Sequence, residues 1–512
     1  MRGKKAIYNI ITNIILQFIT TIYGFVVPKV ILDHFGSDVN GLVVSISQFL
    51  AYISLLESGF GPVVKAVLYK PIARKDNKTI MDILKTSEKL FHRISYVFIV
   101  YIIILCFLFP LIIRNDFAPW FTISLVIIIA ISTFAEYYFG MVYRLFLQAK
   151  QKTYIVSIIQ IISYIISIIL IVLLANLGAN VQIIKLTSGL IFVLRPLVQN
   201  YYVKKKYHIN LKNADNNYKI KQKWDGLAQH IAAVIHEKTD VVVLTVFSTL
   251  SEVSVYSVYL LVAKGIRLLV LAFSNGIDAS FGDMIAKSEQ DNLRRKFSVY
   301  ELLYMIVSTV AFSCAILLIT PFVEVYTKGI TDANYIRPVF GYLIVIAELL
   351  WAIKQPYSLL IKSAGHFKET RVGAWVEAVL NIVLSVVLVI NYGMVGVIIG
   401  TIVSTFIRMV EFVYHANRYI LKQKIWNSVG RIVVMLLAMM IVVAICSAIQ
   451  YSELTGYMSW LLRAIIVFII SCIVTFIVNI IFYKNDVERI INRIVSLTKK
   501  ILKRRAKKGV GK

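Results

Sequence analysis

The chain has 512 residues, of which 59% are apolar and only 16% are charged. Soluble domains are about 45–50% apolar and about 25% charged, so this composition excludes an ordinary soluble enzyme, a collagen and a disordered chain. A transmembrane helix needs about 20 apolar residues, and the chain holds enough of them for about a dozen or more spans. We therefore expect an all-α, polytopic membrane protein.

The charge balance is strongly positive, because 55 Lys and Arg residues face 27 Asp and Glu residues and give a net charge of +28. In a soluble protein this surplus would indicate a nucleic-acid partner. In a membrane protein it gathers in cytoplasmic loops instead, so we expect no nucleic-acid partner. The four cysteines lie in apolar runs without CxxC spacing, which favours packing roles over disulfides or metal ligands.

Apolar runs of spanning length recur fourteen times along the chain. These runs, numbered here as spans 1 to 14, lie at about 7–30, 41–68, 91–113, 120–148, 154–175, 184–202, 226–248, 255–284, 298–321, 339–361, 372–390, 395–417, 426–448 and 458–483.

The Lys and Arg residues between the spans predict the orientation. If the N-terminus is cytoplasmic, the inner segments hold 39 Lys and Arg residues, and the outer connections hold only Arg114, Lys328 and Arg337. This asymmetry follows the positive-inside rule. We therefore expect both termini to be cytoplasmic.

The same pattern predicts the domain organisation. We expect an N-terminal lobe of spans 1–6 (1–203), a basic cytoplasmic linker (204–225), a C-terminal lobe of spans 7–12 (226–425), two further spans (426–483) and a basic cytoplasmic tail (484–512). The tail repeats apolar residues on one helical face among many Lys and Arg residues. It is therefore typical of an amphipathic helix on anionic lipid, and a solvated basic tail is the alternative.

Weak self-similarity relates the two lobes. Glu57 and Gly61, at the end of span 2, match Asp278 and Gly282 at the end of span 8. Further along the same register, Glu136 matches Glu348, and Arg195 matches Arg408. Each lobe has an even number of spans, so the two are parallel and related by a pseudo-two-fold axis along the membrane normal. Transporters built this way bind substrate between the lobes and expose it alternately.

We assign structural or interlobe roles to the acidic and glycine residues of this repeat. They are Glu57, Asp278, Gly61, Gly282, Glu136 and Glu348. Chance matching of such residues in apolar helices is the alternative explanation.

Polar residues inside the spans are the candidate binding residues, because hydrocarbon provides no hydrogen-bond partners for them. Span 1 carries Asn9, Asn13 and Gln17 on one face. This stripe could line a cavity, or it could bind neighbouring helices.

Span 8 carries two cations, Lys264 and Arg267, about 14 and 18 Å below its outer end at 1.5 Å per residue. His236 and Asp240 lie one turn apart in span 7, and Lys354 lies in span 10. We place all five in a substrate cavity. The alternative is that many charges of the spans form structural ion pairs, such as Arg408 with Glu411.

Motifs of enzymes and ATPases are missing from the sequence, which holds no HExxH, no Walker A and no GxSxG. We therefore expect neither an enzyme nor a bound metal or cofactor.

Three stretches carry a resemblance to a known family. They are Ser54–Gly61 (SLLESGFG), Leu145–Ala149 (LFLQA), and Lys238–Leu244 (KTDVVVL) with Glu252–Tyr259 (EVSVYSVY). Together with the fourteen spans they make the chain similar to the polysaccharide-flippase branch of the multidrug/oligosaccharidyl-lipid/polysaccharide (MOP) exporter superfamily. The resemblance covers about residues 5–425.

The resemblance implies a flippase in the bacterial cytoplasmic membrane. It would carry undecaprenyl-pyrophosphate-linked glycan repeat units from the inner to the outer leaflet for capsule, O-antigen or exopolysaccharide synthesis. It implies a cationic cavity lined by spans 1, 2, 7 and 8, and other polysaccharide-assembly membrane proteins as possible partners. Lipid II flippases of this superfamily carry arginines in the first span, whereas span 1 here has no charge between Lys5 and Lys29.

Two other functions were weighed against this one. A cation-coupled multidrug exporter of the same superfamily would need a mainly acidic cavity. Asp240, Glu57 and Asp278 fit this alternative, and Lys264 and Arg267 do not. A membrane glycosyltransferase or polymerase would need a sizeable aqueous loop with acidic or histidine residues. The outer connections here are too short for that.

Overall fold

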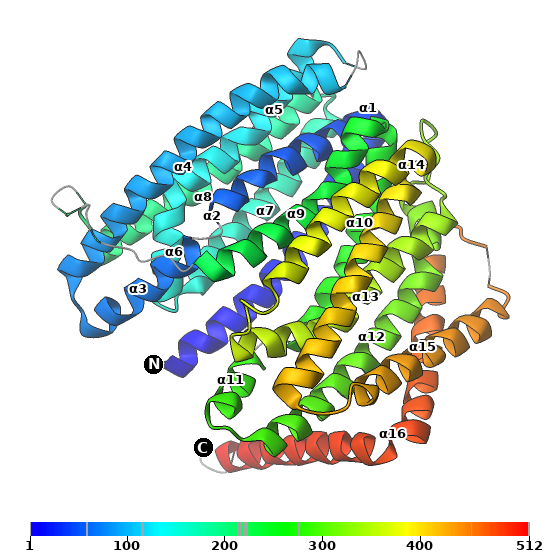
Figure 1. Ribbon diagram of the computed structural model, residues 1–512. Coiled ribbons are helices and arrows are strands. Elements are labelled where there is room, and N and C mark those ends of the chain that lie inside the picture. Colours follow the sequence, from blue (N-terminus) through cyan, green and yellow to red (C-terminus); the bar gives the residue numbers. More distant parts are fainter. Residues whose placement is uncertain are drawn as a thin grey trace. The chain divides into compact units, whose positions relative to one another are not determined.

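The computed structural model describes residues 2–57, 60–113, 117–211, 214–215, 218, 224–274, 277–451 and 453–509. Over that part of the chain the protein is all-helical and has no β-strand (Figure 1).

Fourteen spans are present in the described residues, as the sequence predicts. Eleven helices are long and apolar enough to cross a membrane. Two of them, α1 (Arg2–Leu50) and α14 (Arg371–His415), contain an internal turn and hold two spans each. The fourteenth span is α9 (Trp224–Phe247), whose Glu237, Lys238 and Asp240 make it less apolar than the rest.

The chain packs into two compact units. Unit 1 consists of Met1–Leu261, Gly329–Asn334 and Asn381–Val397. Its helices are α1 with η1 (Ala51–Ile53) and α2 (Ser54–Glu57), α3 (Gly61–Arg74), α4 (Asn77–Ile112), α5 (Pro119–Ala135), η2 (Glu136–Gly140), α6 (Met141–Ala149), α7 (Thr153–Asn176), α8 (Val181–Tyr207), α9, the first half of α10 (Leu250–Leu271) and the middle of α14.

Unit 2 consists of Val262–Lys328, Tyr335–Leu380 and Ile398–Lys512. Its helices are the second half of α10, η3 (Ala272–Ser274), α11 (Asp278–Ala286), α12 (Gln290–Tyr326), α13 (Pro338–Ala364), the two ends of α14 with η4 (Ala416–Leu421), α15 (Trp426–Ser447) and α16 (Tyr457–Gly509). These two units are not the two lobes predicted from the repeat. The lobes group spans by similarity of sequence, and they stay a prediction.

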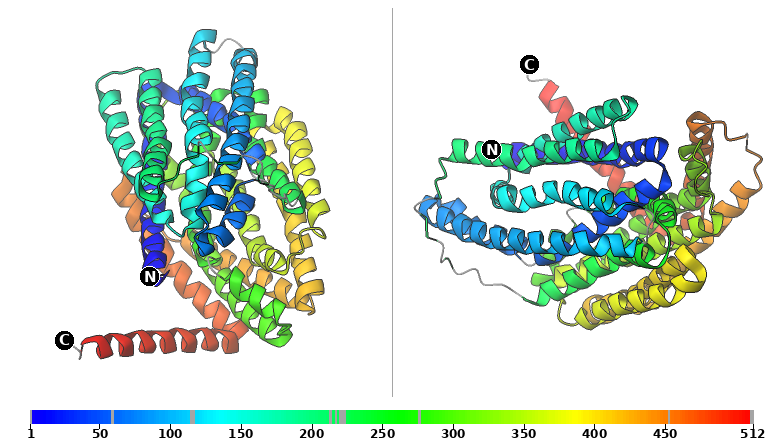
Figure 2. Two further views of the ribbon diagram at one scale, coloured as in Figure 1. Left: turned by 90° about the vertical axis from the view of Figure 1, so that its left-hand side faces the viewer. Right: turned by 90° about the horizontal axis from the view of Figure 1, so that it is seen from above.

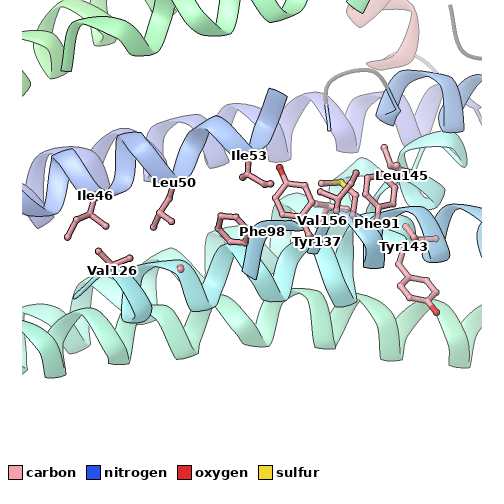
Figure 3. Packing of buried hydrophobic residues seen from close by; sticks show 14 of the residues in the cluster. Ile46, Leu50, Ile53, Phe91, Phe98, Val126, Tyr137, Tyr143, Leu145 and Val156 are labelled. Carbon is pink, nitrogen blue, oxygen red and sulfur yellow. The ribbon is translucent and has the colours of Figure 1, made fainter. Parts of the chain in front are cut away.

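An apolar core joins the helices of unit 1. Ile46, Leu50 and Ile53 follow one another at near-helical spacing and are almost fully buried. Figure 3 shows them on the side of α1 and η1 that faces Phe98 of α4 and Tyr137 of η2. Because lipid is as apolar as leucine, close van der Waals packing is what stabilises such contacts within a membrane.

The turns inside α1 and α14 are tighter than the sequence analysis expects. Loops were expected at 31–40 and 391–394, but the helices reverse within one residue, at Gly36 (φ 82°) and Gly393 (φ 53°). Both residues have a positive φ, which glycine adopts without the steric cost of a side chain. The apolar runs therefore continue closer to each turn than hydropathy alone indicates.

Two of the expected spans are too long. Span 2 was expected to reach residue 68, but it ends at Glu57, and α3 is a separate helix that begins at Gly61 with a proline in its first turn. Span 8 was expected to reach residue 284, but α10 and η3 end at Ser274, and α11 begins at Asp278. The two short helices, α3 and α11, therefore follow repeat-equivalent spans.

The expected linker (204–225) is partly structured where it is described. Helix α8 continues to Tyr207, and Ile209 and Leu211 are buried against the core of unit 1. The backbone N–H of Asp215 donates to Asp82 of α4 at 2.9 Å. The backbone N–H of Tyr218 donates to Thr86 of α4 at 3.2 Å. This segment therefore packs on α4, and residues 212–213, 216–217 and 219–223 lie outside the described part.

The last helix, α16, continues from its span into the basic tail. A non-helical residue, Tyr483 (φ −135°, ψ 39°), separates the two parts. Figure 2 shows the tail running in a different direction from the span of α16. A helix is therefore present where an amphipathic one is predicted, and its side chains beyond Ile490 lie outside the described part.

Buried charges stabilise the junction of the helices around this bend. Arg431 of α15 lies 2.5 Å from Glu301 of α12 and 3.0 Å from Asp486, just after the bend in α16. Tyr357 of α13 donates to the other oxygen of Glu301 at 2.5 Å. One guanidinium thus connects α12, α15 and α16, beside a cavity of about 350 Å³.

We predict that Arg431→Met strongly destabilises the protein. The carboxylate of Glu301, whose side chain is only 2% exposed, would lose its cation, and breaking such a buried pair costs about 3–5 kcal/mol. Thermal unfolding of the purified protein in detergent measures the loss. Arg431→Met combined with Glu301→Gln should recover much of it, because no buried charge then lacks a partner, and the control Lys287→Gln, at an exposed pair, should change little. Equal stability of Arg431→Met and wild type would contradict the interpretation.

Candidate functional site

The two cations of span 8 lie deep in α10. At 1.5 Å per residue from Leu250, Lys264 and Arg267 are about 21 and 26 Å along the helix, deeper than the sequence estimate because the helix begins earlier than expected. Lys264 is half-buried and has no ion-pair partner among the described residues. A cation near the bilayer centre costs about 2.5–3.5 kcal/mol on insertion scales, and no carboxylate of the described part offsets that cost for Lys264.

Arg267 has neighbours from α13. Its guanidinium lies 3.7 Å from Glu348 and stacks 3.5 Å from the ring centroid of Trp351. Glu348 is one of the repeat residues to which a structural role is assigned, and no sequence pattern points to Trp351. The contact places Arg267 and Glu348 together, one turn along α10 from Lys264.

Asp240 is buried in unit 1 within a polar group that the sequence analysis did not find. Tyr256 of α10 donates to one oxygen of Asp240 at 2.7 Å, and Asn381 of α14 donates to the other at 3.5 Å. His236 lies one turn earlier on α9 and is half-buried. A carboxylate with these hydrogen bonds could bind a cation or a sugar hydroxyl.

The polar stripe of span 1 contacts α7 at its first two positions. Asn9 accepts a hydrogen bond from the backbone N–H of Tyr154 at 2.8 Å, and Asn13 accepts one from Ser157 at 2.8 Å. Gln17 is exposed. Asn9 and Asn13 thus hydrogen-bond to a neighbouring helix, which is the alternative given for this stripe above. A cavity role for the stripe stays a prediction.

Lys354 lies in a buried charge network. Its ammonium is 2.5 Å from Glu377 of α14, whose second oxygen is 3.5 Å from Arg408. Arg408 also pairs with Glu411 at 2.6 Å, as the spacing suggested. A network of this kind rigidifies α13 against α14, and a substrate role for Lys354 remains untested.

Glu57, Gly61 and Asp278 lie at helix ends, Glu136 begins η2, and Gly282 and Glu348 lie within α11 and α13. Arg144 of α6 is 3.3 Å from Glu57 and 3.1 Å from Glu136. A Cβ on Gly61 would lie 3.8 Å from Leu145 near the end of span 4, and one on Gly282 would lie 3.9 Å from Ser363 near the end of span 10. Each glycine thus faces the equivalent span of its own lobe; the side chain of Asp278 lies outside the described residues.

A hydrogen-bonded closure joins α1 to α9, α10 and the loop before α13, at the end of unit 1 that is predicted to face outward. It has four side-chain contacts, which are Ser37 with Asp332 (2.7 Å), Asp38 with Ser251, Asn40 with Ser254 (2.7 Å) and Ser45 with Thr245 (2.7 Å). Between them the backbone of Gly41 approaches the carbonyl of Leu250 so closely that a Cβ would collide with it. We call these residues the outer closure.

The outer closure is not predicted from the sequence, because most of its α1 residues lie in the expected loop 31–40. A cluster of small and polar residues at the start of a span was the available signal, since such residues let transmembrane helices approach and hydrogen-bond.

Comparisons with solved structures agree with this architecture. Neither a protein-family model nor a curated protein matches the chain. The lipid II flippase MurJ in an inward closed conformation is similar over 93% of this chain and 99% of its own, with a TM-score of 0.66 and 16% identity. An inward-facing MATE-family multidrug resistance transporter of the MOP superfamily is similar over 78% of this chain and 94% of its own, with a TM-score of 0.56 and 12% identity. An outward-facing MATE-family transporter is similar over 81% of this chain and 95% of its own, with a TM-score of 0.51 and 12% identity.

The chain has the MOP fold. The MOP proteins that it resembles are a flippase and multidrug transporters rather than enzymes. The two multidrug transporters are in an inward-facing and an outward-facing conformation.

We predict that Gly41→Val holds the outer closure open, because the new side chain would collide with Leu250. Overpacking costs about 1–3 kcal/mol, which corresponds to about 5- to 150-fold in the closed-to-open ratio. A Ser45→Cys reporter, in a chain without the native cysteines, should then react faster by that factor with a membrane-impermeant maleimide. Gly265→Val is the matched control, since a Cβ there meets nothing within 4 Å. Equal rates in both variants would refute the closure.

Proposed function

We propose that this multi-pass membrane protein is a flippase for lipid-linked oligosaccharides. It moves undecaprenyl-pyrophosphate-linked repeat units from the inner to the outer leaflet of the bacterial cytoplasmic membrane, for surface-polysaccharide synthesis. The observation that carries the proposal is the position of Lys264, a cation at mid-depth in α10 without an ion-pair partner in the described part of the chain.

Lys264 and Arg267 would replace water around the pyrophosphate while the lipid tail stays in the bilayer. Hydrogen bonds between charged groups are stronger than neutral ones, so an anionic group is the ligand that best offsets the cost of an embedded cation. The likeness to a lipid II flippase supports a lipid-linked substrate. The absence of charge in span 1 between Lys5 and Lys29 favours a substrate other than a peptidoglycan precursor.

The membrane potential would assist transport. Moving one negative charge outward gains about 2.3 kcal/mol per 100 mV, so a pyrophosphate with two charges gains about 4–5 kcal/mol. Because the cytoplasm is electrically negative relative to the outside, the field favours movement of an anion from the inner to the outer leaflet. The outer closure would then open after the substrate enters from the inner leaflet.

We predict that Lys264→Gln slows flipping by about 10- to 150-fold, the equivalent of a charged hydrogen bond worth about 1.5–3 kcal/mol. Thermal stability should hardly change, since no ion pair is lost. Arg267→Gln should lower both flipping and stability, because Glu348 loses a partner. The measurement is leaflet assignment of an undecaprenyl-pyrophosphate oligosaccharide in proteoliposomes under an imposed potential.

The matched control is Arg463→Gln, which removes a membrane cation of α16 that stacks on Tyr451. It should flip at the wild-type rate. Wild-type rates for both Lys264→Gln and Arg267→Gln would refute the role of the cations.

A second candidate function is cation-coupled drug export. The buried carboxylate of Asp240, with Tyr256 and Asn381 bound to it, and the likeness to MATE-family transporters favour it. Expression would then confer resistance to cationic dyes, and Asp240→Asn would abolish that resistance. A flippase would confer none.

A further inference from the structure

A group of lysines surrounds one tyrosine at the end of unit 1 that is predicted to face the cytoplasm. The ammonium groups of Lys150 and Lys152, in the turn between α6 and α7, lie 4.1 and 5.1 Å from the ring centroid of Tyr207, in the last turn of α8. Lys5 of α1 is close enough to Lys150 to affect its titration. We call Lys5, Lys150, Lys152 and Tyr207 the lysine–tyrosine cluster.

The positive charge of the cluster is not compensated. Among the described residues, no carboxylate forms an ion pair with any of its three lysines. Burial, together with the charges of Lys152 and Lys5, lowers the pKa of Lys150, whereas the interaction with Tyr207 raises the pKa of Lys152. The neighbouring lysines thus disfavour the charged form of Lys150, and a bound anion would offset that effect.

The tyrosine adds an unused donor. The hydroxyl of Tyr207 is buried and has no hydrogen-bond acceptor among the described residues. An unsatisfied buried polar group costs about 1–3 kcal/mol. An oxyanion between the lysines could accept this hydrogen bond and interact with the ammonium groups at the same time.

Neighbouring elements increase the positive potential and place it at the membrane surface. The cluster lies at the N-terminus of α7, where the helix dipole is positive and Lys152 provides no side-chain cap. Lys204, Lys205 and Lys206 follow in the last turn of α8, next to its negative end. Exposed tyrosines such as Tyr8 and Tyr201 lie in the same region, and tyrosines typically lie at the headgroup level.

We propose that the lysine–tyrosine cluster is a binding site for a phosphate group of a membrane lipid. Phosphate provides several acceptor oxygens on one centre, which suits two or three ammonium groups and a phenol at once. The site is distinct from Lys264 and Arg267, which lie in unit 2. The phosphate could belong to a resident anionic phospholipid or to the pyrophosphate of an arriving substrate.

Native mass spectrometry of the purified full chain with added phosphatidylglycerol tests the proposal. Wild type should retain this lipid in preference to phosphatidylcholine. Lys150→Gln with Lys152→Gln should weaken retention by at least about tenfold, the effect of one lost charge-assisted hydrogen bond. Lys150→Arg with Lys152→Arg should retain it. Tyr207→Phe, which removes only the donor, should weaken retention by about two- to tenfold.

The matched control is Lys78→Gln with Lys287→Gln, which removes two exposed lysines and should leave retention unchanged. Millimolar inorganic pyrophosphate separates the two sources of phosphate. If it displaces phosphatidylglycerol, the cluster recognises a free pyrophosphate; if it does not, the cluster binds a resident phospholipid. Equal retention of both lipids by wild type, or equal losses in the glutamine and control variants, would overturn the proposal. No step of this test requires transport, so its result is independent of the flippase proposal.

Discussion

The constraint on which this structure depends is that hydrocarbon offers a charged side chain neither water nor counterions. Charges within the spans therefore need partners from the protein. Arg431 is paired with Glu301 and Asp486, and Arg408 with Glu377 and Glu411. The pairs of Arg431 connect three helices that are far apart in the sequence, whereas those of Arg408 lie within α14. Lys264 differs from them, because no described residue pairs with it, and an embedded charge without a partner indicates a function more strongly than a paired one.

The two kinds of helix contact differ in strength. Breaking a buried ion pair costs about 3–5 kcal/mol, whereas a neutral hydrogen bond contributes about 0.5–1.5 kcal/mol. The ion pairs around Arg431 and Arg408 therefore suit contacts that persist. The outer closure has two neutral hydrogen bonds, Asn40 with Ser254 and Ser45 with Thr245, and two hydrogen bonds from serines to the carboxylates of Asp332 and Asp38. None of these four contacts is an ion pair, so each is weaker than the pairs around Arg431 and Arg408.

The MOP fold by itself does not decide the substrate. A lipid II flippase and drug transporters share it with this chain at 12–16% identity. The choice depends on which charges lie in the spans. Here the first span lacks charge between Lys5 and Lys29 and α10 carries two cations, and the proposal of a lipid-linked anion as substrate rests on these residues. The buried Asp240 is the feature that the drug-export alternative would use.

Run length and the distribution of Lys and Arg were sufficient to predict fourteen spans and their order, because both are properties of the linear sequence. The turns at Gly36 and Gly393 lie inside the predicted connections but are tighter than predicted, and spans 2 and 8 end earlier than predicted, since an apolar run does not reveal where its backbone turns. The contact partners of the candidate residues could not be predicted from the sequence either, except for the pair of Arg408 with Glu411. The contacts of Asn9 with α7, Arg267 with Trp351 and Asp240 with Asn381 depend on which helix faces meet. No local sequence pattern encodes which helix faces come into contact, so only the tertiary structure decided these partners.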